Sequence, residues 1–176
     1  MAAGAHADVL EHVGPWTEQD YLALPSDRHQ RMSSQLWLAL SAAAPSGFEV
    51  LEAINVRVAP GKILIPDLAA VTTPGEDRTV AEPGDVALVV EITSPGNAAV
   101  DRAIKPQLYA RAGIPHYLRI ELGAAPPSAV ALRLRRSRYA PVRRVEAGER
   151  LRLDEPFGVD IDLAALATAT RPLNSP

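Results

Sequence analysis

The sequence contains no cysteine among its 176 residues. This excludes disulfide bonds and zinc sites built from thiolates, and it agrees with a reducing cytoplasm. The first residues, MAAGAHADVLEHVGPW, lack the basic and apolar regions of a signal peptide. No segment approaches the roughly 18 consecutive apolar residues of a membrane-spanning helix. We therefore expect a cytoplasmic protein that does not associate with membranes.

Lysine is also scarce. Of the 18 basic residues only Lys62 and Lys105 are lysine, and all the others are arginine. The formal net charge of -3 gives no overall cationic field. A nucleic acid would thus have to be bound by a local basic patch or through a metal ion. In a chain so biased towards arginine, a lysine at a candidate site indicates that a compact point charge is used there.

The remaining composition is that of a globular protein, with 47% hydrophobic and 22% charged residues. The length suits one domain. We expect a flexible lead-in over residues 1–15, a single domain over residues 16–170 and a short tail over residues 171–176. No internal repeat is present.

Three helices are expected. The first is a short helix from Thr17 to Leu24, and apolar residues at three- and four-residue steps predict a second from His29 to about Ala44. A third should begin near Ala103, because proline is tolerated in a first turn but not in the middle of a helix, and should end at Gly113.

The strand pattern predicts an α/β fold with a mixed sheet. Residues 48–58 and 63–71 should form two strands joined by a tight turn, with Pro66 at an edge, a bulge or a point where the strand diverges. Residues 86–92 are apolar on both faces, which is typical of a central strand. Residues 116–122 should form a strand parallel to that of residues 86–92, because a helix connects the two. Residues 129–153 alternate apolar and basic residues and predict a C-terminal β-hairpin, followed by a last turn of helix.

Two carboxylates follow strongly apolar stretches: Asp67 after ILIP, and Glu91 after VALVV. On neighbouring strands they would emerge at a similar level and repel each other unless a cation lay between them. A hard divalent cation such as magnesium prefers carboxylate oxygens and keeps waters for chemistry. The simpler interpretation is that both acids mark strand ends that face solvent.

Lys105 stands at the start of the helix that follows Glu91. A short loop could bring its ammonium group over the strand ends, where it would stabilise negative charge that develops on a phosphate. The alternative is a solvated lysine at a helix start.

Several motifs occur together in one order: PDLAAV, then VVEITSP, then DRAIKPQLYARAGIPHYL. With TEQDYLALP and RHQR before them, they resemble the bacterial putative restriction endonuclease family of the PD-(D/E)xK superfamily, over about Trp16 to Leu122. The resemblance implies a restriction-endonuclease-like core in which Asp67 and Glu91 hold magnesium or manganese and Lys105 assists hydrolysis of a phosphodiester.

The sequence departs from that pattern at two places. Thr93 stands where the superfamily signature has its lysine, and in this family that lysine is thought to have moved to the helix, where Lys105 lies. Between YLALP and RHQR, relatives usually carry a strand-turn-strand segment with an acidic residue, whereas this chain has only Ser26 and Asp27.

Other candidates are supporting residues. His29 and Gln30 could contact a phosphate or water, or could belong to a helix cap. Asp101 could orient Lys105, or serve as an acid at a helix N-terminus. A basic stripe suited to phosphate backbones, or else a solvated face, comprises Arg133, Arg135, Arg136, Arg138, Arg143 and Arg144.

Two functions follow from these interpretations. The first is a magnesium-dependent DNA endonuclease whose metal is held by Asp67, Glu91 and the carbonyl of Ile92. The second is a nuclease-like module without catalysis that binds DNA or a protein. Cleavage of both strands with one site per chain would favour a homodimer. Other hydrolase classes are disfavoured, because the sequence has no G-x-S-x-G elbow and no Walker A loop.

Overall fold

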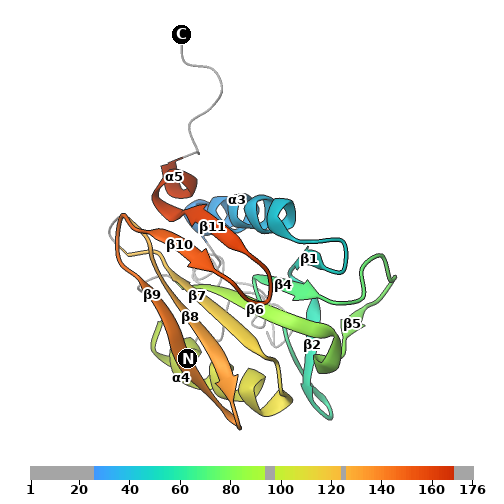
Figure 1. Cartoon of the computed structure of the whole chain (residues 1–176). Helices are drawn as coiled ribbons and strands as arrows, with labels where there is room; N and C mark the ends of the chain where they lie inside the picture. The colour runs from blue at the N-terminus through green and yellow to red at the C-terminus, as the bar shows by residue number, and fades with distance from the viewer. Residues whose placement is uncertain (1–25, 94–97, 124–125, 169–176) are drawn as a thin grey trace, which may run out of the picture.

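A six-stranded mixed sheet forms the centre of the computed structural model, which describes residues 26–93, 98–123 and 126–168 (Figure 1). In spatial order its strands are β1 (Glu49–Glu52), β4 (Leu68–Val71), β6 (Val86–Thr93), β7 (His116–Glu121), β8 (Ser128–Arg135) and β9 (Arg138–Val145). β6 and β7 are parallel and every other neighbouring pair is antiparallel. The parallel pair is connected by helix α4 (Ala98–Ala112), as expected for strands that need a crossover.

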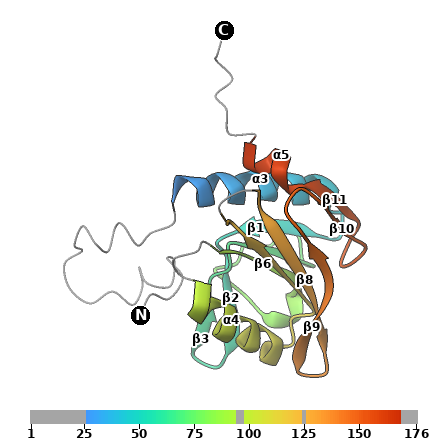
Figure 2. The ribbon, with the colours of Figure 1, turned by 90° about the vertical axis from the view of Figure 1, so that its left-hand side faces the viewer.

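Different elements cover the two faces of this sheet (Figures 1 and 2). One face carries α3 (Asp27–Ala43), α5 (Leu163–Thr168) and the hairpin of β10 (Arg150–Leu153) and β11 (Val159–Asp162). The other carries α4 and a small sheet of β3 (Lys62–Leu64), β2 (Asn55–Ala59) and β5 (Val80–Ala81), after which the short 3-10 helix η1 (Pro83–Asp85) leads into β6. The fold class is therefore α/β, as expected.

Strand β6 is buried along its whole length and supplies both cores. Leu88, Val90 and Ile92 pack in the core on the α3 face, and Val89 packs in the core on the α4 face. Because successive side chains of a strand point to opposite faces, Glu91 is directed to the α4 face. This alternation places a carboxylate beneath α4.

The two strands expected at residues 48–58 and 63–71 are each divided in two. The first breaks at Ala53, whose φ is 49°, and the second breaks around Pro66. The inner parts, β1 and β4, pair in the main sheet, while β2 and β3 pair in the small sheet. The N–H of Ala53 donates to the carbonyl of Asp67 at 3.1 Å, which fixes the breaks opposite each other. The predicted divergence at Pro66 is confirmed.

Helix α3 confirms the second expected helix. Its N-cap is Ser26, whose hydroxyl accepts a hydrogen bond from the N–H of His29 at 3.3 Å. Its buried face consists of His29, Met32, Leu36 and Leu40. The helix expected from Thr17 to Leu24 lies outside the described residues.

The predicted start of α4 near Ala103 is wrong, because the helix begins at Ala98 and contains Pro106 in its interior. A proline removes one helical hydrogen bond, and here the packing of Tyr109 and Ala110 against the sheet keeps the helix continuous. The predicted end is confirmed. Gly113 has φ 86°, and the N–H of Ile114 donates to the carbonyl of Tyr109 at 3.2 Å, which is a Schellman ending.

The C-terminal hairpin is confirmed for β8 and β9. Residues 150–153 were expected to belong to it but instead form β10, which pairs with β11 over the α3 face. Their apolar residue Leu151 is fully buried there, and this burial explains the second hairpin. α5 forms the expected last turn of helix. Within the described ranges, no helix combines the length and apolar character needed to cross a bilayer.

The left-handed backbone at Ala53 gives a first prediction. Replacing Ala53 by valine should lower the free energy of unfolding by about 1–2 kcal/mol, because a β-branched side chain fits poorly at positive φ. Ala53→Gly is the matched control and should be as stable as the wild type or more stable. Urea denaturation measures both. Equal loss in the two variants would contradict the prediction.

Candidate active site

Asp67 lies beside Glu91, because its carboxylate contacts the backbone of Ile92. Leu68 at the start of β4 pairs with Val90 of β6, and Asp67 directly precedes it, where the small hairpin leaves the main sheet. The side chain of Asp67 is 11% exposed and that of Glu91 is 6% exposed. One oxygen of Asp67, Oδ2, accepts a hydrogen bond from the N–H of Ile92 at 2.6 Å. The two acids are therefore held at one place, largely away from solvent.

His29 reaches the same place from α3. Its Nε2 atom is 3.3 Å from Oδ1 of Asp67 and 3.0 Å from the carbonyl oxygen of Ile92. Burial opposes a charge on this imidazole, but the hydrogen bond and charge of Asp67 and the Ile92 carbonyl outweigh it, so the pKa of His29 is raised. His29 thus places a proton between two oxygen atoms.

Two residues of α4 bind Glu91 from the opposite face of the sheet. Lys105 Nζ donates to Oε2 of Glu91 at 2.8 Å, and the hydroxyl of Tyr109 donates to Oε1 at 2.8 Å. The donors are four residues apart and so lie on one side of the helix. Burial raises the pKa of Glu91 to about 7, although the Lys105 charge lowers it. Burial and the neighbouring Glu91 charge also raise the pKa of Tyr109.

Thr93 occupies the position where the superfamily signature has lysine. Its side chain points to the same face of β6 as that of Glu91, since the two are two residues apart. It is buried, and its hydroxyl donates to the carbonyl of Ile120 at 3.2 Å. The ammonium group beside Glu91 comes instead from Lys105 on the helix.

The donors at this place suit a hard cation by their chemistry. They are the carboxylates of Asp67 and Glu91 and the carbonyl of Ile92, all oxygen. His29 Nε2 already lies within 3.3 Å of two of these oxygen ligands, the Asp67 carboxylate and the Ile92 carbonyl, so a single group can contact both. Within the described ranges, no three His, Cys, Asp or Glu side chains are arranged so that they could hold a metal ion together. Magnesium fits such a set, because it takes one or two carboxylates and retains waters.

The other predicted residues are not gathered at this place. Gln30 is exposed, with its side chain free of hydrogen bonds to the described residues. Asp101 lies in α4, and its side chain is outside the part of the chain that the structure describes. Asp27, the first residue of α3, pairs with Arg31 at 2.7 Å.

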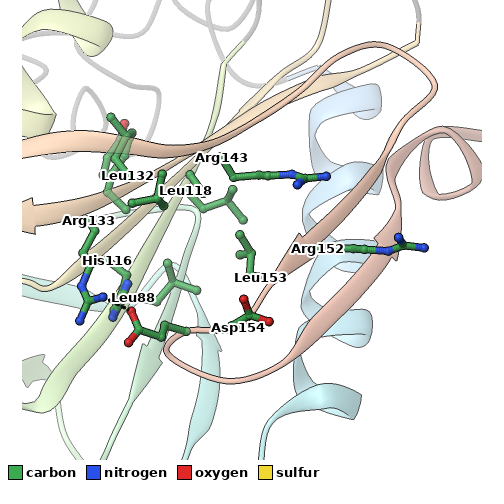
Figure 3. A pocket seen from close by; sticks show the side chains of 13 residues that line it. Leu88, His116, Leu118, Leu132, Arg133, Arg143, Arg152, Leu153 and Asp154 are labelled. Carbon is green, nitrogen blue, oxygen red and sulfur yellow. Dashed lines mark ion pairs between the residues drawn. The ribbon is translucent and has the colours of Figure 1, made fainter.

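The predicted arginine stripe divides between two faces of the sheet. Arg133 and Arg143 line a cavity of about 450 Å³ beside β10 (Figure 3), on the face away from α4. Arg138 lines a different groove, next to α4. Arg135, Arg136 and Arg144 are exposed. Alternation along the strands separates these side chains, so they do not form one continuous surface.

Two residues near Glu91 were missed by reasoning from the sequence. Tyr109 was read only as part of a helix, although its spacing of four residues from Lys105 could have indicated a shared target. Arg119 is the registered neighbour of Glu91 on the parallel strand β7. No local pattern marks Arg119, because its position depends on the pairing register.

The buried pair of Glu91 and Lys105 gives a second prediction. Lys105→Met should lower the free energy of unfolding by about 3 kcal/mol, because it leaves a buried carboxylate without its cation. The double variant Lys105→Met with Glu91→Gln should recover part of the loss. Lys62 is exposed on β3, and Lys62→Met is the matched control. Similar unfolding free energies for the two single variants, measured in urea with EDTA present, would contradict the prediction.

Comparisons with known proteins agree with this architecture. The sequence has no match among the curated proteins that were searched. A similar fold occurs in the crystal structure of a putative nuclease belonging to DUF820 from Anabaena variabilis, with 11% sequence identity, a TM-score of 0.63, and coverage of 82% of this chain and 83% of that chain. Residues 21–166 match the Uma2 family model, described as "Putative restriction endonuclease". Because that match spans most of the chain, the protein belongs to the Uma2 family of putative restriction endonucleases.

Proposed function

We propose that this chain is a metal-dependent endonuclease that hydrolyses phosphodiester bonds of DNA. The observation that carries the proposal is the position of Asp67 beside Glu91, with the Asp67 carboxylate on the N–H of Ile92 and Lys105 bound to Glu91. Membership of a family that is described as putative restriction endonucleases supports the same chemistry. The oxygen donors support a divalent metal as the cofactor.

Asp67, Glu91 and the carbonyl of Ile92 are the proposed ligands of magnesium or manganese. When bound, such an ion supplies positive charge that polarises a phosphate and lowers the pKa of a coordinated water. The chain keeps these oxygens in place through the N–H of Ile92 on Asp67 and the hydroxyl of Tyr109 on Glu91. Each ligand is thus positioned by a neighbour on a helix or a strand.

Lys105 is the proposed group that stabilises the reacting phosphate. Its ammonium carries three protons, and Glu91 accepts one of them at 2.8 Å. Its positive charge beside Glu91 would attract a phosphate oxygen, and burial strengthens the interaction with developing negative charge. His29 is proposed as a positioning residue that holds Asp67 and the carbonyl of Ile92.

Cleavage of a duplex needs a site for each strand. The described residues of one chain offer one candidate site, so we propose that duplex cleavage uses a two-fold pair of chains. A single chain would nick one strand. The pairing of chains can be tested by measuring the ratio of linear to nicked plasmid as the protein is diluted.

The third prediction concerns activity on plasmid DNA with magnesium or manganese. Asp67→Asn and Glu91→Gln should abolish cleavage, and EDTA should abolish it in the wild type. Lys105→Ala should reduce the rate by about 10²–10³-fold, the range for loss of one group that stabilises transition-state charge. Lys62→Ala is the control for lysine and should retain full activity.

Cleavage that persists in both the Asp67 and the Glu91 variants would come from a contaminant or another site and would refute the proposal. Retention of full activity by Lys105→Ala would remove only the role of Lys105. The folding of each variant is checked by its unfolding midpoint, so that inactivity is not confused with loss of structure.

A second candidate function is a nuclease-like module without catalysis. The observation that favours it is that the carboxylate oxygens of both acids and the carbonyl of Ile92 already face protein donors from His29, Ile92, Lys105 and Tyr109. Calorimetry with manganese separates the two functions. Binding that disappears in Asp67→Asn and in Glu91→Gln supports the enzyme, whereas the absence of binding in the wild type supports the module.

A further inference from the structure

A basic groove of about 700 Å³ lies between α4 and the β8–β9 hairpin. Arg111 comes from the last turn of α4, Arg119 from β7 and Arg138 from the start of β9. Gln107 of α4 and Tyr139 of β9 also line the groove. Three different elements therefore bring three guanidinium groups to one groove.

The groove opens beside the candidate active site. Arg119 is paired in register with Glu91 on the parallel strands β7 and β6, so the two side chains emerge on the same face of the sheet. Gln107 follows Lys105 by two residues on α4. From Lys105 to Arg111 the helix rises about 9 Å at about 1.5 Å per residue. The groove and the candidate site therefore share two elements, the helix α4 and the paired strands β6 and β7.

The charge of the groove is of one sign. Its described lining contains no acidic side chain. Arg119 is paired with Glu121 at 3.0 Å, but neither Arg111 nor Arg138 forms an ion pair or a side-chain hydrogen bond with the described residues. Two guanidinium groups are therefore available to a ligand, and their planar donors match phosphate oxygens.

The wall of the groove is fixed. The hydroxyl of Tyr139 donates to the carbonyl of Ile114 at 2.9 Å, and the ring of Tyr139 packs on that of Tyr117 with centroids 5.4 Å apart. Ile114 itself belongs to the Schellman ending of α4. The helix and the hairpin are thus tied together across the groove, and its width is set before a ligand binds.

We propose that this groove binds the phosphate backbone of the DNA strand that leads to the active site, through Arg111 and Arg138. The proposal rests on the proposed function for its ligand, because a nuclease site beside Glu91 requires an adjacent backbone phosphate. It assigns the substrate to the α4 face and leaves the rest of the predicted arginine stripe outside the contact.

The cavity on the opposite face supplies the contrast (Figure 3). There Arg133 is engaged with Glu155 at 2.6 Å, and Asp154 also lines the wall. Arg143 lines this cavity, is exposed and has no ion pair within the described ranges. It lies on β9, like Arg138, yet it faces away from α4. Arg143 is therefore a matched control for charge, exposure and strand.

Binding of a fluorescent DNA oligonucleotide, measured by anisotropy in EDTA so that cleavage does not intervene, tests the proposal. Arg111→Ala and Arg138→Ala should each weaken binding about tenfold at 0.1 M salt, because one released counterion contributes about that factor. Each should also reduce the slope of log affinity against log salt by about one. Arg138→Lys should keep most of the affinity, and Arg143→Ala should bind like the wild type.

The proposal is overturned if Arg111→Ala and Arg138→Ala bind like the wild type, if Arg143→Ala weakens binding as much as they do, or if the wild-type chain does not bind DNA. Its failure differs from failure of the proposed function. Binding that depends on Arg111 and Arg138 in a chain that never cleaves supports the groove and refutes the endonuclease. Metal-dependent cleavage that is unaffected in both arginine variants supports the endonuclease and refutes the groove.

Discussion

Glu91 is an ionisable group in a strand that is buried along its whole length, and much of the surrounding structure compensates for its burial. Removing such a group from water costs several kcal/mol unless it is paired and hydrogen-bonded. Lys105 and Tyr109 supply the pairing, and both come from α4. The position of α4 is in turn fixed by the crossover between parallel strands and by the capped turn at Gly113. A single buried acid thus constrains a strand, a helix and the link between them.

The second acid is held from the other side of the sheet. His29 belongs to α3, which is capped by Ser26 and packs on the core face opposite α4. The candidate site therefore lies where the two helical layers approach the same strand end, with the Ile92 carbonyl and N–H between them. Neither layer alone brings together the oxygen donors and the cationic groups. This dependence on two layers explains why the residues are dispersed between positions 29 and 109 in the sequence.

Reasoning from sequence predicted the parts of this arrangement that follow local patterns. The apolar run before Glu91 indicates a central strand, and Pro66 indicates a break next to Asp67, as the structure has them. The start of α4 was misplaced because helix packing tolerated a proline that propensity alone would exclude. Tyr109 and Arg119 were missed because their approach to Glu91 depends on helix orientation and strand register. The arginines of the hairpin were expected to form one basic stripe or a solvated face. The structure places Arg133 and Arg143 on one face of the sheet and Arg138 on the other, a division that depends on how the two faces are covered.

The paired breaks at Ala53 and Pro66 direct the β2–β3 arm out of the main sheet and onto its α4 face. The hydrogen bond from Ala53 to the carbonyl of Asp67 closes the base of that arm. Residues added to the arm beyond this hydrogen bond would leave Asp67 beside Glu91, because the base of the arm stays closed. The entropy cost of closing a longer loop grows only slowly with its length. The turn around Gly61, which is exposed, is thus a point where the chain can accept an inserted segment without altering the spacing of the two carboxylates.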